Sequence, residues 1–180
     1  MRLSMERHKA NTQSESVYIC LGSNLGDRYF NIIFGLERLR NLSLDGQITS
    51  SPIYETRPWG PVEQGPFLNC AVCIYTNLAP LAVHKKLLSI EREAGRQPGR
   101  ERWGPRELDM DILLFGERVV NSLQLTIPHP RLTQRRFALV PLCDLIPDRY
   151  IPVKNLTVHE ALDKCLDDSW VRLFNLKESK

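Results

Sequence analysis

The hydrophobic and polar positions of this chain repeat with two different periods, one typical of strands and one typical of helices. Apolar runs bounded by turn residues predict strands over residues 17–22, 47–55, 67–76 and 109–115. Apolar residues at helical spacing predict helices over residues 29–42 and 80–94. The resulting order, βαββαβ, is the ferredoxin-like pattern, so we expect an α+β fold with this core.

The pattern continues beyond this core and predicts an added C-terminal hairpin and helices. Gly116 is the expected turn of a hairpin that returns through residues 119–120, and helices are expected over 132–142 and 157–166. Residues 1–16 are polar with mixed charge and predict a flexible leader. We therefore expect a single domain over residues 17–180.

Composition narrows the class of protein. The chain has 180 residues, of which 42% are hydrophobic and 25% charged, which is typical of a soluble domain. Its net charge of +3 is too small to indicate a polyanion partner by itself. Five cysteines, scattered through apolar segments, fit a reducing compartment, and no run approaches the roughly 18 apolar residues of a membrane span. We expect a cytoplasmic monomer without nucleic-acid or membrane partners.

Two carboxylates stand at the start of the strand predicted over residues 109–115. Asp109 and Asp111 are two positions apart, so in a strand both side chains face the same side. Magnesium suits this pair, because it prefers oxygen ligands and accepts few protein carboxylates when phosphates complete its shell. A basic cluster that suits phosphate precedes the pair: Arg92, Arg96, Arg100, Arg102 and Arg106. For the spacing alone, two solvated aspartates are the simpler interpretation.

Other residues are unusual in their local setting. Asn69 lies inside an apolar strand, where its amide needs hydrogen-bond partners. Phe67 and Phe137 fit either a packed core or an aromatic slot. Trp103, within the arginine-rich loop, fits a lid that closes over a substrate. His129 stands between two prolines on a stiff backbone, which favours a functional role over a mobile surface histidine.

The combination R-W-G-P-R-x-L-D-x-D-I over residues 102–112, followed by P-H-P-R over 128–131, is highly specific. Together with a Gly-Ser-Asn turn after the first strand, it resembles the 6-hydroxymethyl-7,8-dihydropterin pyrophosphokinases of folate biosynthesis over about residues 17–152. The resemblance implies transfer of the terminal pyrophosphoryl unit of ATP to the pterin hydroxymethyl oxygen, with AMP as leaving group. It also implies two Mg²⁺ ions.

The resemblance further implies roles for individual residues. Four match the catalytic set, in which the two aspartates also hold the metal: Arg96, Arg106, Asp109 and Asp111. Six match the nucleotide site: Glu91, Trp103, Ile112, Thr126, His129 and Arg135. Seven match the pterin site: Thr56, Pro58, Trp59, Phe67, Asn69, Trp103 and Phe137. The chain departs from relatives at three positions that affect nucleotide contacts and the lid: Leu88, Pro98 and Pro130.

Two other functions fit parts of the pattern. A split βαβ sheet with aromatic and basic residues is typical of single-stranded RNA binding, but the RNP-like signature of that class does not occur in the sequence. A metal-dependent phosphohydrolase would use the same cations to activate water. It would need no flat aromatic slot, so Phe67, Asn69 and Phe137 favour the pyrophosphokinase over the hydrolase.

Overall fold

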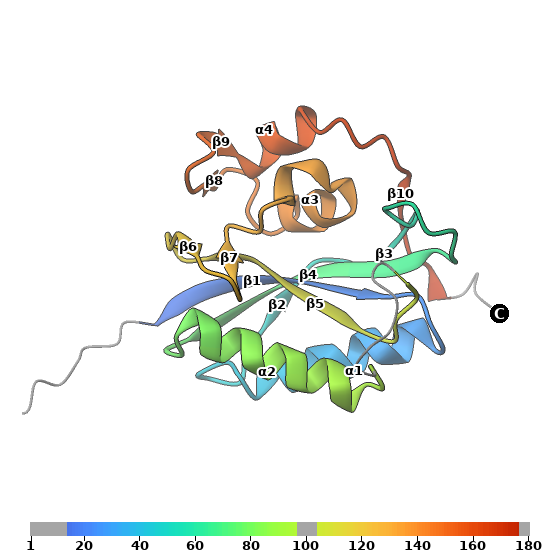
Figure 1. Cartoon of the computed structure of the whole chain (residues 1–180), viewed down its shortest axis with the longest axis horizontal. Helices are drawn as coiled ribbons and strands as arrows, with labels where there is room; N and C mark the ends of the chain where they lie inside the picture. The colour runs from blue at the N-terminus through green and yellow to red at the C-terminus, as the bar shows by residue number, and fades with distance from the viewer. Residues whose placement is uncertain (1–13, 97–103, 177–180) are drawn as a thin grey trace, which may run out of the picture.

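The computed structural model describes residues 14–96 and 104–176, and its centre is one antiparallel sheet between two layers of helices (Figure 1). The strand order is β10-β3-β4-β1-β5, and β2 also pairs with β4. The strands are β1 (Glu15–Ser23), β2 (Thr49–Ser50), β3 (Tyr54–Thr56), β4 (Phe67–Thr76), β5 (Asp109–Phe115) and β10 (Val171–Leu173). The order of β5, β1, β4 and β3 confirms the predicted ferredoxin-like core.

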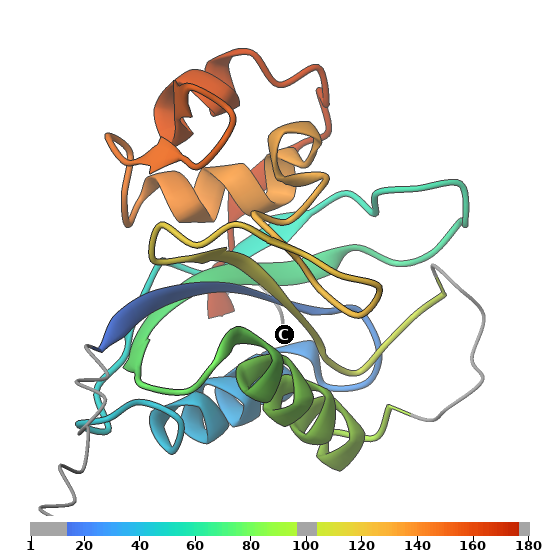
Figure 2. The same cartoon turned by 60° about the vertical axis from the view of Figure 1, so that its left-hand side comes forward.

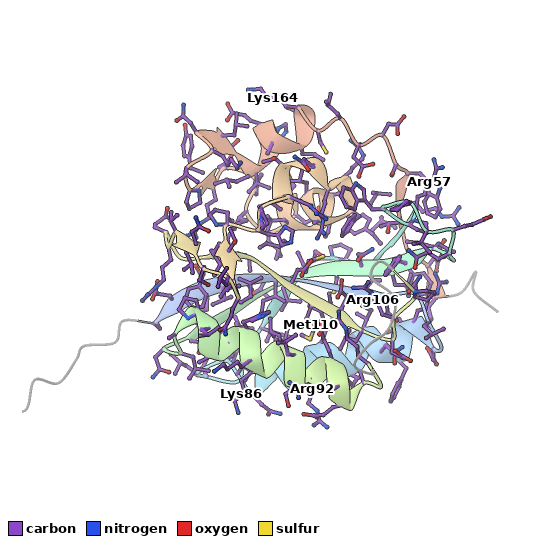
Figure 3. All side chains as sticks on the ribbon, in the orientation of Figure 1. Arg57, Lys86, Arg92, Arg106, Met110 and Lys164 are labelled. Atoms are coloured by element: carbon purple, nitrogen blue, oxygen red, sulfur yellow. The ribbon has the colours of Figure 1, made fainter. Side chains whose placement is uncertain are left out.

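Helices cover both faces of this sheet. Helices α1 (Arg28–Arg40) and α2 (Pro80–Glu93) lie on one face, and α3 (Arg136–Cys143) lies on the other, with α4 (Val158–Asp163) packed outside it (Figures 1 and 2). The sheet therefore separates two hydrophobic cores. In Figure 3 the side chains of both cores fill the space between sheet and helices, and Met110 lies on the α2 side of β5.

Strand β1 is apolar from Val17 to Leu21 because it is buried on both faces there. Val17, Ile19 and Leu21 enter the core under α1 and α2. Tyr18 and Cys20, at the alternate positions, enter the core under α3. Strands β4 and β5 pair with its two edges, and the helices on both sides of the sheet cover the faces of these five residues.

The sequence fixes where the two main helices begin and end. The Asp27 carboxylate accepts a hydrogen bond from the Phe30 N–H at 2.9 Å and so caps the start of α1. Helix α2 begins at Pro80, which needs no N–H partner in the first turn. Just beyond its end, Gly95 adopts φ +111°, a conformation that reverses the chain after the helix.

Several predicted boundaries differ from the structure. The strand expected over residues 47–55 is two short strands, β2 and β3, because Pro52 cannot donate to a ladder at the break. Strand β1 begins at Glu15, two residues before the expected start of the domain. The helix expected over 132–142 is a 3-10 turn (Leu132–Gln134) followed by α3.

The C-terminal additions form two small hairpins. Strand β6 (Val120–Asn121) pairs with β7 (Thr126–Ile127), and β8 (Tyr150–Ile151) pairs with β9 (Leu156–Thr157). The chain thus does turn at Gly116, but β6 pairs forward with β7 and not back onto β5 as predicted. Within the described residues, no helix is long and apolar enough to cross a membrane.

Candidate active site

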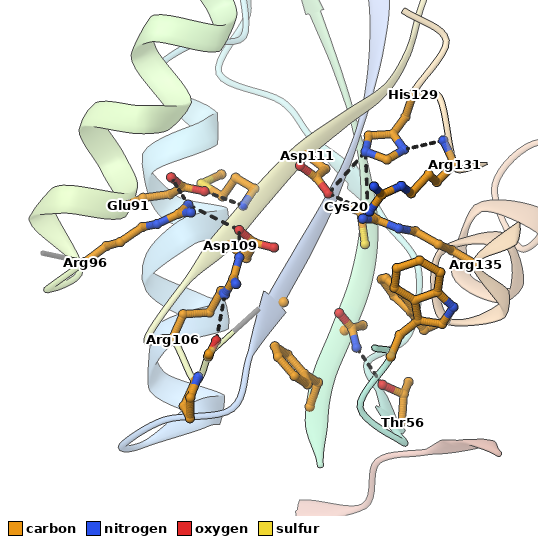
Figure 4. A pocket seen from close by; sticks show the side chains of 18 of the residues that line it. Cys20, Thr56, Glu91, Arg96, Arg106, Asp109, Asp111, His129, Arg131 and Arg135 are labelled. Carbon is orange, nitrogen blue, oxygen red and sulfur yellow. Dashed lines mark hydrogen bonds and ion pairs between the residues drawn. The ribbon is translucent and has the colours of Figure 1, made fainter. Parts of the chain in front are cut away.

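A cavity of about 920 Å³ opens where β1 ends and where β4 and β5 begin. Its wall includes the C-terminal part of α2 on one side of β5 and the segment from His129 to Phe137 on the other (Figure 4). Because β5 is an edge strand, groups from both faces of the sheet meet around it. Residues from five separate segments of the chain therefore line the cavity.

The two aspartates lie side by side on β5 at the centre of this cavity. Asp109 is opposite Gly22 and Asp111 is opposite Cys20 in the register with β1. Both carboxylates are partly exposed, at 29% and 37%, while Met110 between them is buried on the other face of the strand. Their spacing thus places both carboxylates in one cavity, as the pattern predicts.

Three arginines contact these carboxylates. Asp109 Oδ1 accepts hydrogen bonds from Arg106 Nη1 at 2.9 Å and from Arg96 Nη1 at 3.2 Å. Asp111 Oδ2 accepts a hydrogen bond from Arg135 Nη1 at 2.8 Å. Burial and the neighbouring Asp111 raise the pKa of Asp109 despite the two arginines beside it. A positive charge is therefore in place on each side of the acidic pair.

Glu91, near the end of α2, is a buried carboxylate with a raised pKa. Oε1 accepts a hydrogen bond from the Met110 N–H at 2.8 Å, and Oε2 accepts one from the Arg96 guanidinium. Burial and the nearby Asp109 raise the pKa of Glu91 to about 7, although Arg96 and the Met110 N–H oppose this. Glu91 therefore joins α2 to the start of β5.

His129 lies on the opposite side of β5 from Glu91. Its backbone N–H donates to Leu113 O at 2.9 Å, which fixes its segment to β5. The Arg131 N–H donates to Nδ1 at 3.2 Å, and Nε2 lies 3.4 Å from Arg135 Nη1 and 3.7 Å from Asp111 Oδ2. Burial lowers the pKa of His129, and Arg135 and Arg131 lower it further against the attraction of Asp111. These surroundings favour the neutral form of the ring.

The far end of the cavity combines a buried amide with aromatic rings. Asn69 is 2% exposed and donates from Nδ2 to Thr56 Oγ1 at 2.8 Å, which leaves its Oδ1 as an acceptor. Phe67 and Phe137 also line the cavity. The Trp59 ring lies under the Arg135 guanidinium, with 5.2 Å between the Arg135 Cζ atom and the ring centroid. This end can bind a flat, polar-edged ring system.

Most residues that the sequence singles out meet in this one cavity. Twelve of the predicted site residues line it: Thr56, Trp59, Phe67, Asn69, Glu91, Arg96, Arg106, Asp109, Asp111, His129, Arg135 and Phe137. Pro58, Ile112 and Thr126 are not among the lining residues, and the Ile112 side chain is 4% exposed within the core under α1 and α2. Trp103 and Pro98 lie outside the described residues.

Sequence reasoning missed several residues that line the cavity. His84 and Leu88 project into it from the same face of α2, one helical turn apart, but only Leu88 was noted from the sequence. Cys20 lines it from β1, where an apolar run gives no sign of a site, whereas Gly22 belongs to the Gly-Ser-Asn turn noted from the sequence. The spacing of His84, Leu88 and Glu91 on one helix face was the signal that could have found His84.

Comparison with known proteins identifies the family. The family model of 7,8-dihydro-6-hydroxymethylpterin-pyrophosphokinase (HPPK) matches residues 18–147, more than half of the chain. The chain belongs to the HPPK family. HPPK enzymes transfer a pyrophosphoryl group from ATP to hydroxymethyldihydropterin in folate biosynthesis, so the chain is a pyrophosphokinase, and the predicted function and enzyme class are confirmed.

Individual relatives agree with this family. The chain is 42% identical over 138 residues to the 2-amino-4-hydroxy-6-hydroxymethyldihydropteridine pyrophosphokinase of Pseudomonas aeruginosa, covering 77% of this chain and 85% of that protein. It is 35% identical over 158 residues to the enzyme of the same name from Haemophilus influenzae, covering 88% and 98%. Part of the wild-type HPPK-DHPS protein of Plasmodium falciparum has the same fold, with a TM-score of 0.66 at 17% identity, covering 84% of this chain and 44% of that one.

Proposed function

We propose that Asp109 and Asp111 hold two Mg²⁺ ions for HPPK catalysis in this cavity. The donor set fits, because Mg²⁺ takes one or two protein carboxylates when phosphate oxygens complete its octahedron. Within the described residues no three His, Cys, Asp or Glu side chains form a metal-binding group, so phosphate and water would supply the remaining ligands. When bound, the ions would neutralise triphosphate charge and lower the pKa of the pterin hydroxyl.

The basic residues around the aspartates would bind the ATP phosphates. Arg96, Arg106 and Arg135 each place a guanidinium at a carboxylate, where incoming phosphate oxygens can take over the same N–H donors. The Nε2 atom of His129 faces the same place and can form a hydrogen bond with a phosphate group. Phosphoryl-type transfer needs positioning and charge compensation more than covalent help, and these four side chains can supply both.

The pterin would lie at the aromatic end of the cavity. Phe67 and Phe137 can stack on its rings, at about 0.5 to 1.5 kcal/mol per pair beyond burial. The free Oδ1 of Asn69 can accept from an N–H group on the pterin edge, while Thr56 fixes the rotation of that amide. This arrangement would hold the hydroxymethyl group toward Asp109 and Asp111.

Four further assignments stay proposals from the family likeness. Ile112 and Thr126 would lie on the adenosine side, Pro58 beside the pterin, and Trp103 would cover both substrates. Leu88 and His84 line the cavity along α2, so the adenosine would also meet this helix face. Alanine substitution at each position, with separate measurement of the KM values for ATP and pterin, tests them.

One observation supports this function over a phosphohydrolase. The acidic pair and the Asn69–Thr56 amide slot line the same cavity, so an acceptor alcohol and a triphosphate can be bound together. The test is incubation of purified protein with ATP, Mg²⁺ and 6-hydroxymethyl-7,8-dihydropterin. We expect AMP in equal amount to pterin pyrophosphate, whereas ATP hydrolysis that is indifferent to pterin would favour the hydrolase.

We also propose that the chain acts as a monomer in the cytoplasm. The free thiols of all five cysteines suit a reducing compartment. Size-exclusion chromatography with light scattering tests the monomer, and fractionation of cells that express the chain tests the compartment. A stable dimer in solution would contradict the first proposal.

A further inference from the structure

Glu91 uses both carboxylate oxygens within the protein. Its side chain is 3% exposed, although it lines the cavity wall near Asp109 (Figure 4). Oε1 accepts from the Met110 N–H at 2.8 Å, and Oε2 accepts from Arg96. Each oxygen is thus already paired with a group of the protein, so this buried carboxylate needs no substrate contact to be satisfied.

The first bond satisfies a backbone N–H at the edge of the sheet, between the two aspartates. Met110 lies between Asp109 and Asp111 in β5, and β5 has a partner strand, β1, on one side only. An N–H on the open side of an edge strand needs an acceptor from outside the sheet. Glu91 supplies it, so α2 fixes the backbone that carries both carboxylates.

The second bond anchors an arginine at the same place. Nη1 of Arg96 contacts both Glu91 Oε2 and Asp109 Oδ1, the latter at 3.2 Å. The Arg96 backbone N–H also donates to the Glu91 carbonyl oxygen at 3.0 Å, through the turn that Gly95 makes at φ +111°. The guanidinium and the backbone N–H of Arg96 are therefore both hydrogen-bonded to Glu91.

We infer that Glu91 is a positioning residue, which sets the Arg96 guanidinium and the Asp109–Asp111 backbone relative to each other without touching substrate. This inference rests on the proposed roles of Arg96 and the acidic pair. A buried carboxylate is costly unless each oxygen is satisfied, so it defines one geometry for its partners. Glu91 thus acts on pyrophosphoryl transfer through Arg96.

Two substitutions separate the two bonds. In Glu91→Gln, the amide oxygen still accepts from the Met110 N–H, but an NH₂ group faces Arg96 in place of an oxygen. In Glu91→Ala, both acceptors are lost. Glu93→Gln is the matched control, because Glu93 is on the same helix, is 47% exposed and pairs with Arg38 away from Asp109. Its kinetics should equal those of the wild type.

The first arm of the experiment measures kcat and KM in a double-mutant cycle. We expect Glu91→Gln to lower kcat about tenfold or more, with the pterin KM within about twofold, because a charge-assisted bond to a catalytic group is lost. In an Arg96→Ala background, Glu91→Gln should cost nothing more. A wild-type kcat in Glu91→Gln, or losses that multiply in the double variant, would overturn the inference.

The second arm needs no activity and measures hydrogen exchange of the Met110 amide by NMR. Protection should remain in Glu91→Gln and Glu93→Gln and fall in Glu91→Ala. Equal protection in all three variants would show that Glu91 does not hold the strand, and would refute that half of the inference. If the wild type released no AMP, the proposed function would fail, while this arm would still decide whether Glu91 positions β5.

Discussion

Asn69 Oδ1 lies 2.7 Å from the position that a Cβ atom on Gly22 would occupy. The two residues are opposite each other in the β1–β4 register, so the carboxamide of Asn69 passes directly over the glycine. Its Nδ2 donates to Thr56 Oγ1 from this position. The absence of a side chain at Gly22 therefore allows the amide that we assign to pterin recognition to lie against β1.

Gly22→Ala should weaken pterin binding selectively. The added methyl group would displace the Asn69 amide and break its bond to Thr56, which leaves a buried polar group without its partner at a cost of about 1 to 3 kcal/mol. We expect the pterin Kd to rise about tenfold, with the ATP Kd unchanged, in equilibrium titrations. Gly65→Ala is the control, because no atom lies within 4 Å of its added Cβ. Equal effects of both variants would contradict this role of Gly22.

Asp109→Ala and Asp111→Ala should each lower kcat by two orders of magnitude or more while the fold survives. Each carboxylate is at least 29% exposed in the cavity, so its loss leaves no large void in the core. Chelation of divalent ions should abolish AMP release, and added Mg²⁺ should restore it. Steady-state kinetics and circular dichroism check these outcomes, and near-normal rates in both variants would remove the metal-holding role.

Local pattern was enough to predict the core and the acidic pair. Strand β1 is buried on both faces, so its continuous apolar run is unambiguous, and two-residue spacing in β5 places Asp109 and Asp111 together in any strand register. The amide of Asn69 was also informative, because an amide inside an apolar strand has to find a partner, here Thr56. These features depend on few residues that are close in sequence.

Long-range contacts explain what the sequence did not predict. Strand β10 is three residues long, half-exposed, and forms only because β3 offers an edge at residues 54–56. His84 lies on a helix face that is solvent-exposed unless β5 packs beside α2. The Glu91 side chain points toward β5 because it accepts from the Met110 N–H. No neighbouring strand pairs with that N–H, since β5 is an edge strand. None of these relations appears within a local window of residues.

Arg135→Lys should weaken ATP binding even though it conserves charge. Arg135 donates to Asp111 at 2.8 Å and stacks near the Trp59 and Phe137 rings, at 5.2 and 5.6 Å from its Cζ atom to their centroids. A lysine ammonium has no planar group that can lie against these rings while it donates to Asp111. We expect the ATP KM to rise about tenfold in steady-state assays, whereas Arg40→Lys, at an exposed position on α1, should have no effect.

Glu55 connects three elements on the side of the sheet away from β5. Its Oε1 accepts from Arg28 Nη1 of α1 at 3.0 Å, and its Oε2 accepts from Arg172 Nη2 of β10 at 2.6 Å. The Glu55 side chain is only 14% exposed. Burial alone would raise the pKa of Glu55, but the hydrogen bonds from Arg172 and Arg28 outweigh burial and lower it below the usual 4.5.

Glu55→Gln should therefore reduce the free energy of unfolding at pH 7 by about 1.5 to 3 kcal/mol, the range for hydrogen bonds to charged groups. Because the folded-state pKa of Glu55 is lowered, its stabilisation is fully present above the unfolded value of 4.5 and is lost as pH falls through the folded value. Urea unfolding across a descending pH series should show the two proteins converging. Glu37→Gln, whose carboxylate is 64% exposed, should differ from wild type by under about 0.5 kcal/mol throughout. A Glu55→Gln difference that stayed constant with pH would show that the ion pairs do not stabilise β10.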